Sequence, residues 1–213
     1  LEFRRVLFRS AVLEETAEMI RSKGGEVTIH VGSAATYEEA EKMVQTAVQA
    51  YGKLDVLYNN IGGGWIELDK KLHEISAEAF ERIVSSNLTA VFNACKAAVV
   101  QFLKQGTGGS IVNVTASEHV RRMANPVYAY TKAGMIEMSK NMANDYLDDR
   151  IRVNCRGPGL FAYEPIKDPM VAPNPVNLLR LSPKNARQGV PSDMAYAGLF
   201  LASDESSFIS GQY

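Results

Sequence analysis

Polar and apolar residues along the chain alternate between helical and strand-like spacing. Apolar positions three and four residues apart predict helices over residues 13–24 and 37–50, the second of which Thr36 caps. Short runs of β-branched and other apolar residues predict strands over 26–31 and 54–58. The second strand is almost continuously apolar, which is typical of a strand covered on both faces.

The second half of the chain continues this alternation. Residues 76–105 carry an apolar stripe too broad for one ordinary surface helix, so part of this helix is expected to face another subunit. Further strands are predicted over 111–114 and 151–155, and further helices over 128–146 and 191–203. The alternation predicts an α/β domain built on a parallel sheet.

Composition and charge limit the kinds of partner that we expect. The 213 residues are 46% hydrophobic and 22% charged, enough for one domain with a substantial core. A net charge of −1 gives no reason to expect nucleic acid or an anionic membrane as a partner, so small molecules and copies of the chain are expected instead. Cys95 and Cys155 lack disulfide or metal-site spacing, and His30, His73 and His119 are scattered, so no metal is expected.

The compartment follows from the cysteines and the hydropathy. Two isolated thiols are typical of a reducing environment. No apolar run approaches the roughly 20 residues that a membrane-spanning helix needs. A soluble, cytoplasmic protein is therefore expected.

Tyr128 and Lys132 carry the clearest chemical signal. They lie four residues apart in a helical pattern, so both side chains project from one helix face. A neighbouring ammonium favours the ionised phenol, which brings a tyrosine closer to the pKa at which it exchanges a proton with an alcohol or ketone. The pair is a candidate acid/base centre.

Four further segments accompany this pair in a fixed order. A strand ends in Asn59-Asn60-Ile61-Gly62, Asn87 lies within a helix, a second strand ends in Thr115-Ala116-Ser117, and a third leads to Pro158-Gly159. In this order and spacing, from about residue 11 to residue 213, the chain resembles the short-chain dehydrogenase/reductase family.

The resemblance implies a fold and an activity. The fold would be a Rossmann-like, doubly wound parallel sheet in three α/β/α layers. The activity would be that of an NAD- or NADP-dependent oxidoreductase that interconverts a secondary alcohol and a ketone, as 3-oxoacyl-carrier-protein reductases and sugar or steroid dehydrogenases do. The long apolar helix and the Tyr128 helix would pair across a homo-oligomer, a tetramer or a dimer.

The resemblance also implies catalytic roles. Tyr128 would be the general acid in reduction and the general base in oxidation. Lys132 would hold the phenolate and hydrogen-bond the nicotinamide ribose, and Asn87 would anchor a water in the proton relay. The substrate-orienting hydroxyl would be Thr115 or Ser117, with Ser117 slightly favoured because serine is the family's usual residue.

The cofactor-binding residues follow in the same way. Asn60, Ile61 and Gly62 would line the adenosine and the nicotinamide ribose, and Pro158 and Gly159 would pack beside the nicotinamide, with Tyr128 and Lys132 completing the site. Residues 160–185 occupy the position of the family's substrate loop. Ser33 replaces the family's usual adenine-binding aspartate.

One family feature is missing. Dinucleotide-binding domains open with a strand and a glycine-rich turn that cradles the pyrophosphate, and no such turn precedes Leu13. Residues 1–10 match nothing in the family pattern and are expected to be a non-native or disordered arm, and 11–213 a single partial domain truncated at both ends. The alternative to an active enzyme is a non-catalytic chain that packs or oligomerises but cannot bind the dinucleotide.

Overall fold

The computed structural model describes residues 10–63, 65, 67–159 and 190–213. The expected N-terminal arm, up to residue 9, and the expected substrate loop at 160–185 lie outside the described residues. Every structural statement below concerns the described part of the chain.

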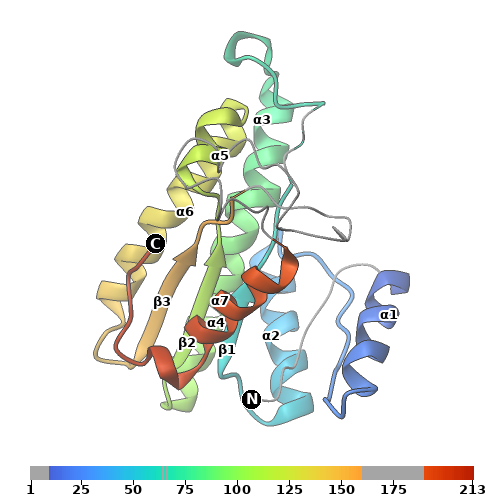
Figure 1. The fold of residues 1–213 in the computed structure, drawn as a ribbon, viewed down its shortest axis with the longest axis vertical. Helices are drawn as coiled ribbons and strands as arrows, with labels where there is room; N and C mark the ends of the chain where they lie inside the picture. Colours follow the sequence, from blue (N-terminus) through green and yellow to red (C-terminus); the bar gives the residue numbers. More distant parts are fainter. Residues whose placement is uncertain (1–9, 64, 66, 160–189) are drawn as a thin grey trace, which may run out of the picture.

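A parallel sheet forms the middle layer (Figure 1). Its described strands are β1 (Val56–Asn59), β2 (Gly109–Val114) and β3 (Ile151–Arg156), in the spatial order β1-β2-β3. Tyr58 pairs with Val112, and Val112 pairs with Asn154, so the three strands run in register towards a common carboxyl edge. Each strand lies within one or two residues of its predicted position.

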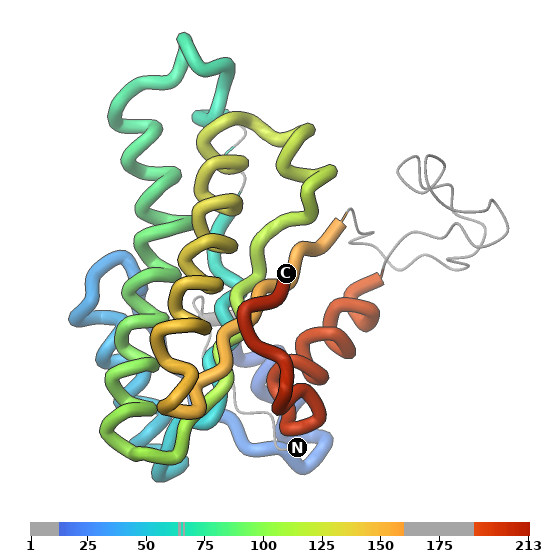
Figure 2. The backbone as a smooth tube through the Cα atoms, turned by 90° about the vertical axis from the view of Figure 1, so that its left-hand side faces the viewer, coloured from blue at the N-terminus to red at the C-terminus, as the bar shows by residue number. Residues whose placement is uncertain are grey.

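Helices cover both faces of the sheet, as Figures 1 and 2 show. α2 (Tyr37–Tyr51), α4 (Ala90–Gln105) and α6 (Pro126–Asp145) form one outer layer, and α7 (Pro191–Ala202) packs on the opposite face. This is the doubly wound, three-layer arrangement that the sequence predicted. The remaining described elements are α1 (Ser10–Arg21), α3 (Ala77–Val84), α5 (Glu118–Met123), a π-helical turn (Ser85–Thr89) and two 3₁₀ turns (Leu72–Glu74 and Asp204–Ser206).

The core lies between the sheet and the layer that contains α4. Phe102 and Val91 of α4 and Ile111 of β2 are fully buried. A buried polar chain crosses the same region, because Asn59 Nδ2 donates to Asn113 Oδ1 at 2.8 Å and Asn113 Nδ2 donates to the Ser139 hydroxyl at 2.8 Å. Buried amides need such partners, so this chain fixes how β1, β2 and α6 meet.

Local sequence accounts for the start and end of α2. Thr36 is its N-cap, with the Glu39 backbone N–H donating to Thr36 Oγ1 at 3.4 Å, as predicted. At the other end Gly52 adopts a φ of 80°, a left-handed conformation that favours glycine and that ends the helix.

The strand predicted over residues 26–31 does not form. These residues lie outside the described sheet, whose two edge strands are β1 and β3, and Val31 is 67% exposed. The segment is instead tied to α2 through a hydrogen bond of 2.9 Å between His30 Nδ1 and Thr46 Oγ1. Its β-branched residues favour an extended backbone, but a strand also needs a hydrogen-bonded neighbour.

The long apolar helix predicted over 76–105 is interrupted. α3 and α4 are joined by a π-helical turn at Ser85–Thr89, so the whole stretch Ala77–Gln105 is helical but not uniformly α. By length and composition alone this stretch could cross a membrane, which the sequence analysis did not expect. However, 56% of its apolar window is buried inside the protein, and α4 packs against α2 and the sheet as a core helix does.

Candidate active site

The predicted site residues come from the carboxyl edge of the sheet and the helices beside it. Asn60, Ile61 and Gly62 follow β1, Thr115 and Ser117 follow β2, and Pro158 and Gly159 follow β3. In open α/β sheets ligands bind at this edge. The parallel register therefore gathers segments that are up to about 100 residues apart in sequence.

Lys132 lies at the centre of this edge. Its side chain is only 4% exposed, and its Nζ donates to the Ile61 carbonyl at 3.1 Å and to the Val114 carbonyl at 3.2 Å. Burial lowers its pKa to about 8, although nearby Cys155 opposes the shift. The ammonium thus joins the ends of β1 and β2, and one of its three N–H groups is not used by these two bonds.

Tyr128 lies one helical turn before Lys132 in α6. The Lys132 ammonium is 5.8 Å from the centre of the Tyr128 ring, and the tyrosine is half-buried. Because the two residues share a face of one helix, their separation is set by helix geometry rather than by a mobile loop. The predicted pair is therefore brought together at the carboxyl edge of the sheet.

Asn87 occupies the π-helical turn between α3 and α4 and is fully buried. Its Nδ2 donates to the Gly63 carbonyl at 3.1 Å and to the Ile83 carbonyl at 3.1 Å, while its Oδ1 accepts from the Gly63 N–H at 3.2 Å. The side chain thus clamps the backbone of the segment that follows β1. Single π-helical turns within α-helices are frequent at functional sites.

Gly62 fits this clamp because it has no side chain. Its φ of 124° lies in the region that L-residues rarely adopt. An added Cβ would overlap Asn87 Oδ1 and would come within 3.2 Å of Lys132 Nζ. The position therefore requires glycine for both its conformation and its close approach to two predicted site residues.

The structure separates the two candidates for the substrate-orienting hydroxyl. Thr115 is buried, and its hydroxyl donates to the Lys132 backbone carbonyl at 2.5 Å. Ser117 is half-buried at the start of α5, where its hydroxyl accepts a 3.2 Å hydrogen bond from the Val120 N–H. Ser117 keeps its own O–H as a donor, whereas the Thr115 hydroxyl proton is already used.

The edge offers a fit for one half of a dinucleotide. Asn60 and Gly62 are exposed beside Lys132. The Pro158 carbonyl accepts a hydrogen bond from the Ser117 N–H at 2.9 Å, which holds the end of β3 near the end of β2. A lysine with an unused donor and a glycine that permits close approach suit a nicotinamide ribose. Among the described residues, no strand with a glycine-rich turn precedes α1, which is the first described element.

Asp69 is a site residue that the sequence analysis missed. It is 0% exposed, and its carboxylate accepts hydrogen bonds from the Val127 N–H at 3.2 Å and the Tyr128 N–H at 2.8 Å. The sequence gives no sign that a carboxylate in this loop will contact a helix that starts more than fifty residues later.

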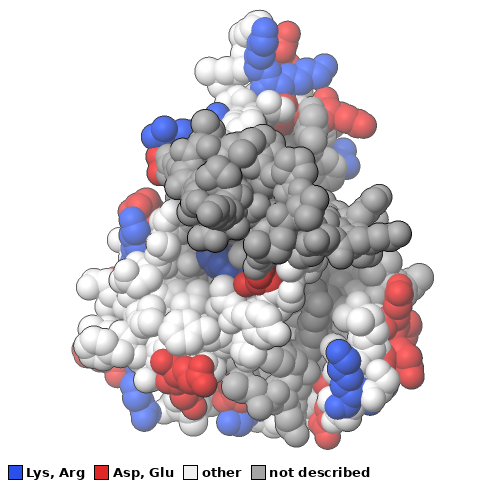
Figure 3. Space-filling view, viewed as in Figure 1, with Lys and Arg blue, Asp and Glu red and all other residues white. Residues whose placement is uncertain are grey.

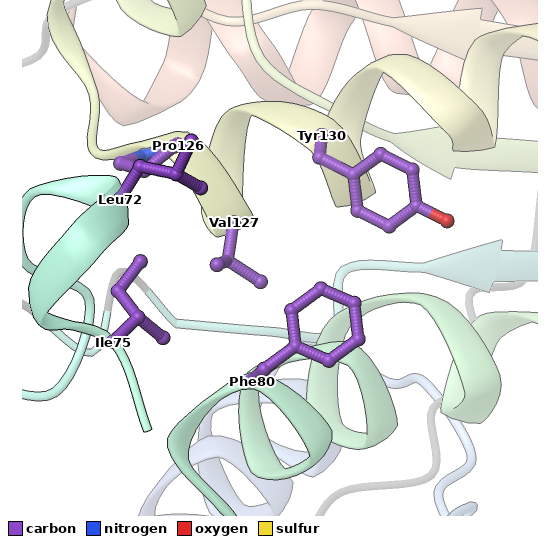
Figure 4. A pocket seen from close by; sticks show the side chains of 6 residues that line it. All are labelled: Leu72, Ile75, Phe80, Pro126, Val127 and Tyr130. Carbon is purple, nitrogen blue, oxygen red and sulfur yellow. The ribbon is translucent and has the colours of Figure 1, made fainter. Parts of the chain in front are cut away.

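An apolar pocket of about 280 Å³ lies on another side of α6 (Figure 4). Successive helical residues are turned by about 100°, so Val127 and Tyr130 project from the side of α6 opposite to that of Tyr128 and Lys132. Its lining residues are Leu72, Ile75, Phe80, Pro126, Val127 and Tyr130. This pocket is separate from the candidate active site.

The face that carries α7 has little charge in its middle. Figure 3 shows most Lys, Arg, Asp and Glu atoms near the rim of this face, with both signs mixed, and only a small basic and a small acidic patch in its middle, beside the grey residues. On the described part of this face the charges form no continuous basic patch of the kind that binds nucleic acid.

The fold and the carboxyl edge define a Rossmann-like α/β protein. The sequence pattern of the family described as enoyl-(acyl carrier protein) reductase matches residues 6–213. An uncharacterised oxidoreductase from Thermotoga maritima is 36% identical over 203 residues, which cover 93% of this chain and 78% of the relative. Glucose 1-dehydrogenase 2 from Bacillus subtilis is 31% identical over 199 residues, covering 93% and 76%.

Two further comparisons agree. A 3-oxoacyl-[acyl-carrier-protein] reductase from Thermotoga maritima is 37% identical over 191 residues, covering 88% of this chain and 74% of the relative. A short-chain dehydrogenase/reductase structure from Burkholderia xenovorans aligns with a TM-score of 0.80 and 31% identity, covering 99% of this chain and 81% of that one. The chain belongs to the short-chain dehydrogenase/reductase family, whose members are oxidoreductases that use NAD or NADP.

Proposed function

We propose that the protein interconverts a secondary alcohol and a ketone, with Tyr128 as the acid/base group. The observation that carries the proposal is the buried Lys132 ammonium, whose pKa is lowered to about 8 and which lies 5.8 Å from the Tyr128 ring. A positive charge at this distance stabilises the phenolate over the phenol. Proton exchange by the phenol is the step that hydride chemistry at a carbinol carbon requires.

In reduction Tyr128 donates its phenolic proton to the substrate oxygen while a hydride reaches the carbonyl carbon. In oxidation the phenolate accepts the hydroxyl proton as the hydride leaves the carbinol carbon. When bound, the nicotinamide cofactor supplies or accepts that hydride. Lys132 stabilises the phenolate and offers its remaining N–H to the ribose, and Asn87 fixes the backbone after β1 and anchors the proton-relay water.

The Ser117 hydroxyl orients the substrate oxygen in this proposal. Its support is the O–H that the cap hydrogen bond from Val120 leaves available, in contrast to the Thr115 hydroxyl, which donates to the Lys132 carbonyl. The residues that line the cofactor are Asn60, Ile61, Gly62, Pro158 and Gly159. The substrate is a small molecule; the different substrates in the names of the relatives do not transfer to this chain.

Cofactor binding and turnover test the proposal. NADH and NADPH are titrated separately into the 213-residue chain while nicotinamide fluorescence is followed, and oxidation of secondary alcohols is then screened with the oxidised form of the cofactor that binds. Tyr128→Phe should bind the cofactor but lose turnover. Tyr130→Phe is the matched control, because it removes a phenolic hydroxyl two residues away on the other side of α6, and it should remain active.

Two results would contradict the proposal. The first is no binding of either cofactor at millimolar concentration, which is the result that a non-catalytic chain predicts. The second is binding with equal turnover by Tyr128→Phe and the native chain. Either cofactor giving saturable binding would also assign the preference between NAD and NADP.

We also propose that copies of the chain associate, and that the protein acts in the cytoplasm. Phe92, Val100 and Leu103 of α4 are exposed large apolar residues, and a groove of about 370 Å³ lies between α4 and α6. Exposed large apolar residues on one face of a helix are typical of protein interfaces. Phe92→Arg should lower the molar mass measured by light scattering; an unchanged mass would contradict this interface.

A further inference from the structure

Asp69 caps the catalytic helix from a distant loop. α6 begins at Pro126, and Asn125, which occupies the N-cap position, makes no side-chain cap hydrogen bond. The Asp69 carboxylate takes that role instead, with Oδ1 accepting from the Val127 N–H at 3.2 Å and Oδ2 from the Tyr128 N–H at 2.8 Å. Both N–H groups are among those that a helix leaves without internal partners.

Burial of the Asp69 carboxylate would cost free energy without these two N–H partners. Asp69 is 0% exposed, and a buried charge needs hydrogen bonds and an opposite electrostatic potential. The N-terminus of α6 provides both, because its free N–H groups and the helix dipole favour an anion. In addition, Asn125 Nδ2 donates to the Asp69 backbone carbonyl, so the loop and the helix start are joined twice.

The loop that carries Asp69 is tied to the Asn87 side of the site. The backbone N–H groups of Leu68 and Asp69 both donate to the Trp65 carbonyl at 2.8 Å. Trp65 Nε1 donates to the Ser86 hydroxyl at 2.8 Å, next to Asn87 in the π-helical turn. One short loop therefore connects the π-helical turn, where Asn87 holds the backbone that follows β1, with the first turn of α6.

The backbone at Trp65 shows that this loop is held by its surroundings. Its φ of 45° lies in the left-handed region, which a large aromatic residue rarely adopts. Arg82 lies over its ring, 4.6 Å from the ring centre. Such a conformation persists where neighbouring contacts determine it, and it occurs most often at functional sites.

We infer that Asp69 is the positioning residue for Tyr128. The inference rests on the function proposed above, because it assigns Asp69 the task of holding the phenol that exchanges the proton. Tyr128 is the third residue of α6, so loss of the cap frees the turn on which the phenol is mounted. A displacement of about 1 Å in a reacting group can cost about a hundredfold in rate.

Three variants separate positioning from general stability. Asp69→Ala removes both acceptor oxygens, whereas Asp69→Asn keeps one. Thr36→Ala is the matched control, because it deletes the side-chain cap of α2, whose bond from the Glu39 N–H is 3.4 Å long, away from the predicted site residues. Cofactor affinity, measured by nicotinamide fluorescence, shows whether each variant still folds and binds.

The first readout is amide hydrogen exchange, which needs no substrate. In Asp69→Ala the Val127 and Tyr128 amides should exchange about tenfold faster than in the native chain, as loss of a typical cap predicts, and Asp69→Asn should lie between the two. Thr36→Ala should leave these two amides unchanged. Unchanged exchange in Asp69→Ala would overturn the inference.

The second readout is steady-state kinetics with the best alcohol of the screen. Asp69→Ala should lower kcat about tenfold to a hundredfold with little change in the KM of the cofactor, and Asp69→Asn should recover part of the loss. Equal kcat in Asp69→Ala and Thr36→Ala would overturn the inference. An inactive native chain, or an active Tyr128→Phe, would instead overturn the proposed function and, with it, the positioning role of Asp69.

Discussion

The buried Lys132 ammonium makes protein stability depend on pH in a defined window. Burial lowers its pKa from an ordinary 10.5 to about 8. Between about pH 8 and 10.5 the unfolded chain therefore still binds a proton at this lysine that the folded protein has released. Below about pH 8 the buried charge lowers the free energy of unfolding by its full amount. The free energy of unfolding then rises between about pH 8 and 10.5, and above that window the charge no longer lowers it.

The magnitude follows from the pKa difference. Each tenfold difference in proton affinity is worth about 1.4 kcal/mol, so a pKa change from 10.5 to about 8 corresponds to about 3 kcal/mol. Lys132→Met removes the titrating group but retains an unbranched side chain. The free energy of unfolding of the native chain should therefore rise by about 3 kcal/mol, relative to that of Lys132→Met, between pH 7.5 and pH 10.5.

Urea unfolding at closely spaced pH values measures this difference. The cysteine thiols of the unfolded chain also titrate in this range, but they are present in both proteins and largely cancel in the comparison. Lys140→Met is the control, because Lys140 is an exposed lysine on the same helix that pairs with Glu137 at 2.7 Å. Native and Lys132→Met curves that run parallel across the window would refute the assignment of a buried, destabilised ammonium.

Three further predictions concern single positions. Gly62→Ala should lower the free energy of unfolding by about 2–4 kcal/mol, measured by urea unfolding, because its Cβ meets Asn87 in a backbone conformation unfavourable for alanine. The Cys95 thiol, 1% exposed and with a pKa raised to about 12 by burial, should resist alkylation in the native protein and react on unfolding. Phe102→Ala should cost about 3–5 kcal/mol, whereas Leu147→Ala, at a 65% exposed position, should cost well under 1 kcal/mol; equal thermal shifts would contradict this.

Periodicity predicted the fold because most elements have one buried face. The three described strands, the Thr36 cap and the helices around them follow the apolar spacing closely. The strand expected at 26–31 was wrong, since local preference for an extended backbone cannot supply the neighbouring strand that completes a ladder. The π-helical turn at Asn87 could not be predicted from periodicity either, because the apolar stripe continues across it.

The sequence by itself determined which residues can perform chemistry here. Tyr128 and Lys132 meet because a helix brings residues four apart onto one face, and that rule is local. Tertiary structure alone decided the protonation preference of Lys132, since its low pKa comes from loss of solvent around the buried ammonium, and only folding buries it at the ends of β1 and β2. It also decided which residue caps α6: the partner of Tyr128 is Asp69, and only folding brings that loop to the helix.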